Sequence, residues 1–521
     1  MHVSAALTLL AGTVVAAKTQ LGWGFGGSAY QIEGAWNEDG KGVSVYDKWF
    51  HDGNGLIPGD RNNPNGDVAA DHYHRYKDDL KHLSQLKATA YRFSISWPRI
   101  LPNCNGTVNE AGVKFYSDYI DEIIKNGAEP YLTMFHWDTP QACQDRYGGW
   151  QSDLIVEDFL NYADILFQNY GDRIKYWLPL NEPEANCQFG WGVGMFAPGI
   201  KGGDPVHFEC FHRSHLLHAR IVQLARSKYA DKAKNWKFGM PSIISWIEPA
   251  DPTSKADVDQ ANFELGKYAG WFFDPTVFGD YGAETKADTW MGKYVPKFSV
   301  SDASILKGTV DFIGLNYYSA SSASASGKQV NLATQPTSEP WQTVYPAGLR
   351  KIINWLYKRY SMDIIVTEIG YPGVNENVTT LDDIVGGVND GWRHKFWEEH
   401  LTNLTAAVEE DKMPVKAFLA WALMDNFEWI SYWYRFGCIA VDFNNGTLAR
   451  TVKNSTVWMS NYFNTHYDNP YGRTPQVDGA PAGDGSVVGK GETGTTKSGA
   501  GRKFVVGFGV GVVGVVLALV M

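Results

Sequence analysis

Stretches of mostly apolar residues recur along the chain, and segments with helical spacing separate them. The stretches are residues 21–30, 88–97, 129–137, 174–182, 236–246, 311–319, 363–371 and 415–425. The segment 71–87 places apolar residues at intervals of three and four: Tyr73, Tyr76, Leu80, Leu83 and Leu86. This spacing is typical of a helix that packs one face on a sheet, and residues 111–127 and 348–360 show it too. A strand–helix alternation repeated eight times predicts an α/β fold, a (β/α)8 TIM barrel in a single large domain.

A doubly wound open sheet is the alternative arrangement for alternating strands and helices. No glycine-rich phosphate-binding loop follows the first apolar stretch, which favours the barrel. From about Pro475 onward the chain becomes rich in glycine and loses its periodicity. We therefore expect the folded domain to span residues 18–473, followed by a Gly/Ser/Thr-rich linker over residues 474–503.

Both ends of the chain resemble processing signals. Residues 1–17 contain an apolar run that ends in Ala16 and Ala17, which predicts a signal peptide, although a clear positive charge is lacking at the start. Residues 504–521 are apolar and end the sequence. Such a tail is either a lipid-anchor signal or a transmembrane segment. We therefore expect a secreted or cell-surface protein that its C-terminal tail attaches to a membrane.

The glycosylation motifs and cysteines agree with secretion. Five Asn-X-Thr triplets begin at Asn105, Asn377, Asn403, Asn445 and Asn454. The five cysteines allow at most two disulfides and leave one thiol. Cys104 and Cys143 follow neighbouring predicted strands, so we expect a bridge between them. The cysteine spacings match no zinc pattern, and we predict neither a metal nor a cofactor.

The amino-acid composition narrows the classes of molecule that the protein is expected to bind. Hydrophobic residues make up 44% of the chain and charged residues 20%, which is typical of a globular protein with a large core. The net charge of −11 argues against nucleic acid as a partner. The 20 tryptophans suit stacking on sugar rings, but aromatic residues fill cores first. Nothing in the sequence indicates an oligomeric state.

Polar residues stand where the predicted strands end, although strands buried on both faces should be apolar. They are Gln31, Arg92, His136, Asn181, Glu182, Asn316, Tyr318 and Glu368, with Trp421, Glu428 and Trp429 at the last strand. The carboxyl ends of barrel strands meet at one face, where the active sites of such barrels lie. We therefore expect these side chains to surround one cavity.

Two carboxylates on opposite sides of such a cavity indicate glycoside hydrolysis. One carboxylic acid protonates the departing glycosidic oxygen, and the other carboxylate attacks the anomeric carbon. Arg92 would keep the attacking carboxylate ionised, with Asn316 beside it and Tyr318 donating a hydrogen bond. Glu182 needs the opposite treatment, a pKa raised by burial and by a neighbouring negative charge.

Eight segments, in order, resemble glycoside hydrolase family 1, the β-glucosidase family. They are FGGSAYQIEGAW, YRFSISWPRI, FHWDTPQA, LNEP, DFIGLNYYS, VTEIG, WALMDNFEW and RFG, spread over about residues 21–467. The resemblance implies a barrel that hydrolyses β-glycosides with retention, Glu182 being the acid/base and Glu368 the nucleophile. It also implies that Trp421 stacks on the sugar and Trp341 lies on the aglycone side. The sugar hydroxyls would be held by Gln31, His136, Asn181, Glu428 and Trp429.

The chain departs from the family pattern at four places. Pro179 stands where the family has Thr, Ile369 where it has Asn, and Ala422 where it has Ser. The segment between Trp429 and Arg435 is one residue shorter than usual. None of these changes removes a carboxylate, so they bear on efficiency and substrate preference rather than on the reaction.

The expected function is a retaining β-glucosidase that acts on terminal non-reducing β-D-glucosyl residues, with weaker action on β-galactosyl or β-fucosyl residues. The main alternative is a non-catalytic cell-surface co-receptor that binds sugar or protein on the same scaffold, as in klotho-type members that lack a catalytic carboxylate. Thioglucosidases are a second alternative, but they carry Gln in place of the acid/base, where this chain has Glu182. The natural aglycone is not evident from the sequence.

Overall fold

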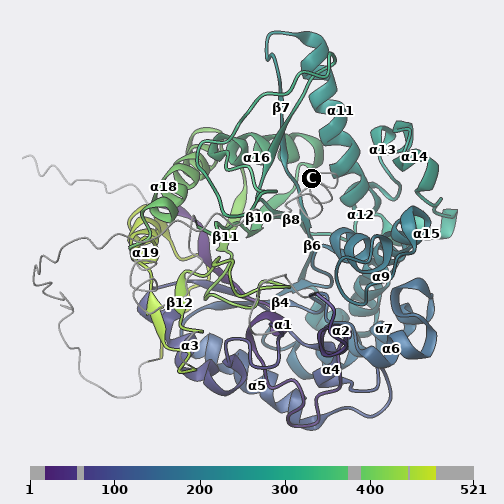
Figure 1. The fold of residues 1–521 in the computed structure, drawn as a ribbon, viewed down its shortest axis with the longest axis vertical. Helices are drawn as coiled ribbons and strands as arrows, with labels where there is room; N and C mark the ends of the chain where they lie inside the picture. Colours follow the sequence, from purple (N-terminus) through teal and green to yellow (C-terminus); the bar gives the residue numbers. More distant parts are fainter. Residues whose placement is uncertain (1–17, 56–63, 374–388, 444–445, 477–521) are drawn as a thin grey trace, which may run out of the picture.

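A closed barrel of eight parallel strands forms the centre of the molecule in the computed structural model, which describes residues 18–55, 64–373, 389–443 and 446–476. The strands follow the order β10-β11-β2-β3-β4-β5-β6-β8 around the barrel (Figure 1). Their bounds are β2 Gly22–Gly26, β3 Ala90–Ser94, β4 Glu129–Thr133, β5 Tyr176–Leu178, β6 Lys237–Ile243, β8 Phe312–Asn316, β10 Asp363–Glu368 and β11 Val415–Ala420. Each predicted stretch contains one of them. The predicted (β/α)8 barrel is confirmed, and the open doubly wound sheet is excluded.

Helices surround the barrel, with the long ones packed on its outer face (Figure 1). The three predicted helical segments form α3 His72–Gln85, α5 Glu110–Lys125 and α16 Pro346–Tyr360. Among the described residues, the other helices of at least seven residues are α2 Val45–His51, α6 Gln141–Tyr147, α7 Leu154–Tyr170, α9 Gly203–Lys228, α11 Lys255–Phe272, α15 Val300–Leu306, α18 Gly391–Thr405 and α19 Asn454–His466. In α3 the stripe residues Leu80 and Leu83 are fully buried, as expected for a helix that packs on a sheet.

Short elements complete the fold in the loops. The short helices are α1 Ala29–Ile32, α4 Trp97–Ile100, α8 Pro183–Asn186, α10 Ala230–Ala233, α12 Asp274–Phe278, α13 Ala283–Ala287, α14 Met291–Tyr294, η1 Gly149–Gln151, η2 Cys187–Gly192 and η3 Ala406–Glu410. Three two-stranded sheets pair β1 Thr19–Gln20 with β14 Tyr467–Asp468, β7 Trp246–Pro249 with β9 Ala320–Ala323, and β12 Ile439–Val441 with β13 Arg450–Val452. The pair β1–β14 joins the two ends of the described chain.

Side chains fill the barrel at the amino-terminal ends of its strands. An inner cluster takes one residue or more from most strands: Ala90, Tyr131, Leu178, Phe312, Ile365, Ala417 and Leu419. Tyr471 reaches this layer from the C-terminal segment, and its hydroxyl lies 2.7 Å from that of Tyr131. A Cβ atom at Gly22 would lie 2.1 Å from the Tyr471 hydroxyl oxygen, so this position of β2 needs a glycine. The packed amino-terminal end leaves the carboxyl ends of the strands to form a cavity.

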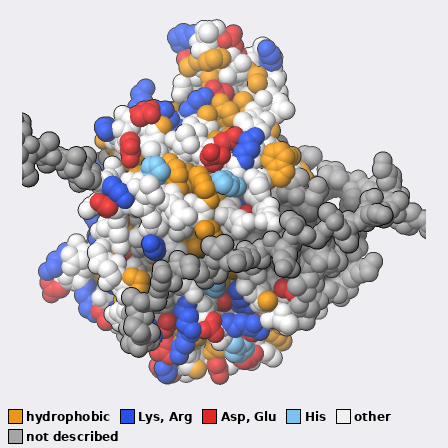
Figure 2. Space-filling model, turned by 90° about the vertical axis from the view of Figure 1, so that its left-hand side faces the viewer, with side chains coloured by type: hydrophobic (Ala, Val, Ile, Leu, Met, Phe, Trp, Pro, Cys, Tyr) orange, Lys and Arg blue, Asp and Glu red, His pale blue; other side chains and the backbone are white. Residues whose placement is uncertain are grey.

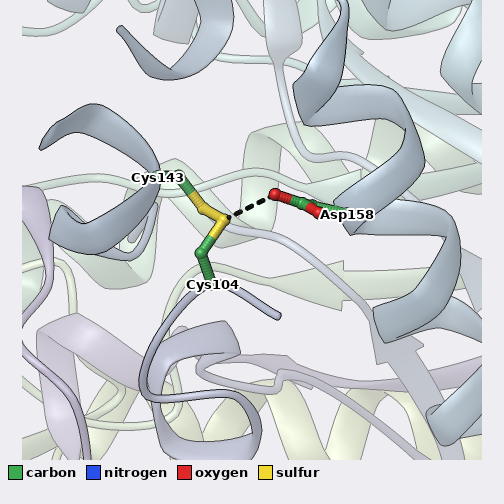
Figure 3. Close-up of side chains that lie close together, drawn as sticks. All are labelled: Cys104, Cys143 and Asp158. Atoms are coloured by element: carbon green, nitrogen blue, oxygen red, sulfur yellow. Dashed lines mark hydrogen bonds between the residues drawn. A yellow bond between two sulfur atoms is a disulfide. The ribbon is translucent and has the colours of Figure 1, made fainter. Parts of the chain in front are cut away.

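Two disulfides fasten the loops, and Cys438 is a buried free thiol. The predicted bridge between Cys104 and Cys143 is confirmed, with 5.2 Å between the Cα atoms. The second bridge, Cys187–Cys210, joins η2 to α9 and was not predicted from the sequence. Asp158 lies 3.1 Å from Cys104 Sγ (Figure 3). Because the two sulfurs bond to each other, this group offers no thiolate to a metal.

The predicted processing segments lie outside the described residues: the signal peptide 1–17, the tail 504–521 and all of the linker except residues 474–476. Asn377 and Asn445 also lie there. Within the described ranges, no helix is both long and apolar enough to cross a membrane. On the face shown in Figure 2, acidic and basic side chains are interspersed.

Candidate active site

A cavity opens at the carboxyl ends of the barrel strands. Sixteen residues line it: His136, Trp137, Glu182, Phe189, Phe196, Ile243, Tyr318, Glu339, Trp341, Glu368, Trp421, Glu428, Trp429, Ile430, Tyr434 and Phe436. Eight of them are site residues predicted from the sequence. The other four predicted residues, Gln31, Arg92, Asn181 and Asn316, are buried and do not line the cavity. Each of them contacts at least one of the lining residues.

Glu368 is the last residue of β10 and has two hydrogen-bond donors. Arg92 Nη1 lies 2.5 Å from Oε1, and the Tyr318 hydroxyl donates to Oε2 at 2.8 Å. Burial raises the pKa of Glu368, and the positive charge and hydrogen bond of Arg92 oppose that rise. A guanidinium and a phenol stabilise the carboxylate form. Glu368 is therefore the more easily ionised of the two central carboxyls.

Glu182 lies four residues after β5 and immediately before Pro183, the first residue of α8. Its φ of 43° is in the left-handed region, which is strained for a residue with a side chain. Asn316 Nδ2 donates to Glu182 Oε1 at 2.5 Å. Burial raises the pKa of Glu182 well above its ordinary value, and the charges of Glu368 and Glu184 add to this. Glu182 is therefore the carboxyl of the two that holds its proton to higher pH.

Asn316 was predicted to support the nucleophile, and it contacts both carboxyls. Besides its bond to Glu182, it lowers the pKa of Glu368. Its own orientation follows from Thr367, whose hydroxyl donates to Asn316 Oδ1 at 2.6 Å. The amide nitrogen must then face the two glutamates.

Asn181 connects Arg92 to His136. Its Oδ1 accepts from Arg92 Nη2 at 2.5 Å and from Asn316 at 3.3 Å. Its amide nitrogen therefore faces His136 Nε2, 3.2 Å away. Burial and the Arg92 charge lower the pKa of His136 well below its ordinary value, so the ring is neutral. With Nε2 accepting, Nδ1 carries the proton, and it is buried without a partner among the described residues.

Aromatic rings form one wall of the cavity. The His136 ring stacks at 5.4 Å from Trp421 and 5.7 Å from Trp429, and Trp137 stacks at 4.3 Å on Trp429. Gly26 at the end of β2 leaves space for Trp421, because a Cβ there would lie 2.9 Å from the indole. A rigid apolar face of this kind suits the C–H face of a sugar ring.

Glu428 places a free acceptor in the cavity wall. Its Oε2 is buried with no hydrogen-bond partner among the described residues. Burial raises the pKa of Glu428 to about 8, while hydrogen bonds from Trp421 and Gln31 oppose the rise. Gln31 itself accepts from Ser28 at 2.6 Å and donates to Asn426 at 3.3 Å. Gln31 is thus a buried neighbour of Glu428 that is not among the residues lining the cavity.

Several cavity residues were not found by sequence reasoning. Glu339 stands two positions before Trp341 in a segment without periodicity, and its nearness to that tryptophan was the one available signal. Phe189 in η2, with Phe196 and Ile243, carries no distinguishing pattern. Glu184 is a third carboxyl, 1% exposed, near Glu182.

The four departures from the family pattern differ in whether they line the cavity. The Ile369 side chain is fully buried in the main core and does not line the cavity. Pro179 is also buried. Ala422 packs in a small cluster with Tyr318, Trp421 and Phe436. The shortened segment supplies Ile430 and Tyr434 to the cavity wall, so this departure alone reaches the cavity through its own side chains.

The strand ends of this (β/α)8 barrel bring two buried carboxyls, an arginine and a stacking tryptophan to one cavity. This combination defines a class of protein, the barrel glycoside hydrolases. A sequence profile of Glycosyl hydrolase family 1 matches residues 18–467. The chain belongs to this family and is a glycoside hydrolase.

Relatives with known names agree with this assignment. The chain is 37% identical over 494 residues to raucaffricine-O-β-D-glucosidase from Rauvolfia serpentina, covering 84% of this chain and 89% of the relative. A family 1 β-glucosidase from the fungus Humicola insolens, solved with glucose, is similar with TM-score 0.80 and 31% identity, covering 87% and 100% of the two chains. A rice β-glucosidase variant solved in a covalent complex with glucose has TM-score 0.78 and 32% identity, covering 85% and 98%.

Proposed function

We propose that this protein is a retaining β-glucosidase that removes terminal non-reducing β-D-glucosyl residues. The observation that carries the proposal is the contrast between two carboxyls in one cavity. Arg92 and Tyr318 stabilise an ionised Glu368, whereas burial and nearby carboxylates keep Glu182 protonated. A nucleophile and a general acid are the two groups that retaining glycoside hydrolysis needs.

In the first step Glu182 transfers its proton to the glycosidic oxygen while Glu368 attacks the anomeric carbon. The carbon–oxygen bond to the aglycone breaks, the aglycone leaves as an alcohol, and a glycosyl ester forms on Glu368. In the second step the carboxylate of Glu182 takes a proton from water, which attacks the anomeric carbon and releases Glu368. Two inversions give net retention. The covalent glucose complex of the rice relative supports this course.

The sugar proposed is glucose without phosphate. Glu428 offers an unpaired buried oxygen to the 4- and 6-hydroxyls, and His136 Nδ1 offers a proton to another hydroxyl. In its ionised form Glu428 would repel a 6-phosphate. The relatives named β-glucosidase support glucose. We expect weaker hydrolysis of β-galactosides and β-fucosides, because a carboxylate can also reach an axial 4-hydroxyl.

Covalent trapping tests the roles of the two carboxyls. A 2-deoxy-2-fluoro β-glucoside with a good leaving group should leave a fluoroglucosyl mass on the peptide that contains Glu368. NMR of the first product formed should show the β-anomer. A label on any other residue, or an α-anomer, contradicts the mechanism. Absence of turnover on every aryl β-glycoside would favour the co-receptor alternative.

The substrate is tested separately. Rates on aryl β-glucoside, β-galactoside, β-mannoside and 6-phospho-β-glucoside should be highest for the unphosphorylated glucoside. A preference for the phosphorylated sugar would overturn the role proposed for Glu428.

We also propose that the protein is secreted and held at the cell surface through its C-terminal tail. The support is the sequence alone: the apolar residues 1–17, the apolar residues 504–521 and the glycosylation motifs. If the tail is a lipid-anchor signal, a phosphatidylinositol-specific phospholipase releases the protein from cells. If it is a transmembrane segment, detergent alone releases it. Full-length protein free in the medium would contradict both.

A further inference from the structure

The cavity contains a carboxyl that the proposed mechanism does not use. Glu339 is 7% exposed and lines the cavity together with Trp341, Tyr434 and Glu428. A buried carboxyl is costly unless it is hydrogen-bonded or paired. In the described part of the chain, no cation is among the groups that shift its pKa. Glu339 therefore retains acceptor capacity toward the cavity.

The backbone around Glu339 is fixed by hydrogen bonds to both neighbouring strand ends. Ser338 N–H donates to Gly373 O at 2.9 Å, and Gln342 Nε2 donates to Gly370 O at 2.8 Å, both just beyond β10. Ser319, beyond β8, donates its hydroxyl to Trp341 O at 3.2 Å. A carboxyl whose loop is tied to the ends of two strands in this way is preorganised for recognition.

Glu339 interacts electrostatically with two other residues that line the cavity, Glu428 and Tyr434. Burial raises its pKa to about 8, the charge of Glu428 adds to this, and a hydrogen bond from Trp341 opposes it. Glu339 in turn is the charge that raises the pKa of Tyr434, after burial, to about 12. Glu339 therefore lines the same cavity as Glu428 and Tyr434, a phenol from the shortened segment, within electrostatic reach of both.

We propose that Glu339 is a specificity-determining residue that, with Tyr434, binds the exocyclic hydroxymethyl group of a β-hexopyranoside. The inference rests on the proposed function, in which Glu428 accepts the 4- and 6-hydroxyls. The 6-hydroxyl is the sugar group that projects farthest from the ring on that side. Glu339 and Tyr434, which line the same cavity as Glu428, supply it with an acceptor and a donor. A pentopyranoside, which lacks this group, leaves both unpaired.

The test compares an aryl β-glucoside with the aryl β-xyloside, which lacks carbon 6. For Glu339→Ala we expect kcat/KM on the glucoside to fall about tenfold to a hundredfold, the range of a lost hydrogen bond to a charged or buried partner. The rate on the xyloside should stay within about twofold, because no contact is lost. Glu339→Gln, which keeps the shape and a carbonyl acceptor, should lie between the wild type and Glu339→Ala.

Glu398→Gln is the matched control, since Glu398 is exposed on α18 and outside the cavity. It should change neither rate. Equal losses on both substrates, or no loss on the glucoside, would overturn the proposal, and thermal unfolding of each variant identifies a loss caused by misfolding. Calorimetric binding of glucose and xylose gives the same comparison without turnover. If the wild type hydrolyses neither glycoside, the proposed function fails while this binding difference still decides the role of Glu339.

Discussion

Glu182 and Glu368 carry the same side chain, and their neighbours decide what each can do. Glu368 has Arg92 at 2.5 Å and a phenol at 2.8 Å. Glu182 has an amide donor and two carboxyls whose charges raise its pKa. The pair thus titrates as a unit in which Glu368 loses its proton first. Between these two ionisations the pair holds one proton, on Glu182, the residue proposed as the acid.

Replacing Glu182 should show how much each substrate depends on proton donation to its leaving group. For Glu182→Ala we expect a loss of about 10²–10⁴-fold on substrates with poor leaving groups, the usual contribution of general acid catalysis. Activated aryl glucosides should lose far less, because their leaving groups depart without a proton. Steady-state kinetics over a series of leaving groups measures this. Added azide should partly restore turnover of the activated substrates, and equal losses across the series would contradict the acid role.

Glu184 should set the alkaline limit of activity. Its negative charge raises the pKa of Glu182, and its own pKa is raised by burial to about 8. Glu184 carries this charge as the pH rises through about 8; in Glu184→Gln the charge is absent there, so the pKa of Glu182 falls and the acid form is lost at lower pH. We expect the alkaline limb of the kcat/KM profile to move toward lower pH. The acidic limb, which follows Glu368, should move less; an unchanged alkaline limb would contradict the coupling.

At the scale of elements, the loops above the barrel complete the cavity. Ile243 ends β6, and its N–H donates to Glu184 at 3.0 Å. The segment η2 contributes Phe189 to the wall, and the Cys187–Cys210 bridge joins η2 to α9. Cys104–Cys143 ties two other loops together. Of these two bridges, Cys187–Cys210 is the one that begins in an element lining the cavity.

Removing each bridge should therefore have different consequences. Both Cys187→Ala/Cys210→Ala and Cys104→Ala/Cys143→Ala should lower stability by about 2–4 kcal/mol, the usual effect of losing a disulfide. The first pair should also raise KM, because Phe189 is no longer held against the cavity, while the second pair should leave KM nearly unchanged. Thermal unfolding and kinetics on an aryl glucoside measure the two effects. Equal changes in KM would show that η2 is held by packing alone.

At the scale of the whole molecule, the packing between barrel and helices seals Cys438. The residue is fully buried, and burial raises the pKa of its thiol to about 12. Reactivity belongs to the thiolate, so the native thiol should be inert at neutral pH. We expect iodoacetamide to label no cysteine in the folded protein and one cysteine in urea without reductant. Cys438→Ser should abolish the labelling in urea; labelling of the native protein would indicate local opening.

The barrel was predictable because its signal is local and repeated. Each strand is a short apolar run, and each packing helix shows its stripe within one segment, as α3 does. The polar residues at the strand ends, Glu182 and Glu368 among them, were visible because they interrupt buried runs. Once the barrel is known, the common direction of its strands brings such residues to one face.

What the sequence alone determined was the fold, the family and the set of polar strand ends, because short-range periodicity and motif order encode them. Contacts between segments far apart in the chain became known from the tertiary structure. These are the Cys187–Cys210 bridge, the hydrogen bond of Gln31 to Glu428, and the presence of Glu339 in the same cavity as Glu428. The structure also supplies the physical cause of the expected contrast between Glu182 and Glu368, because a pKa depends on burial and on charges from other strands. Such neighbours are close in space without any regular spacing in the sequence.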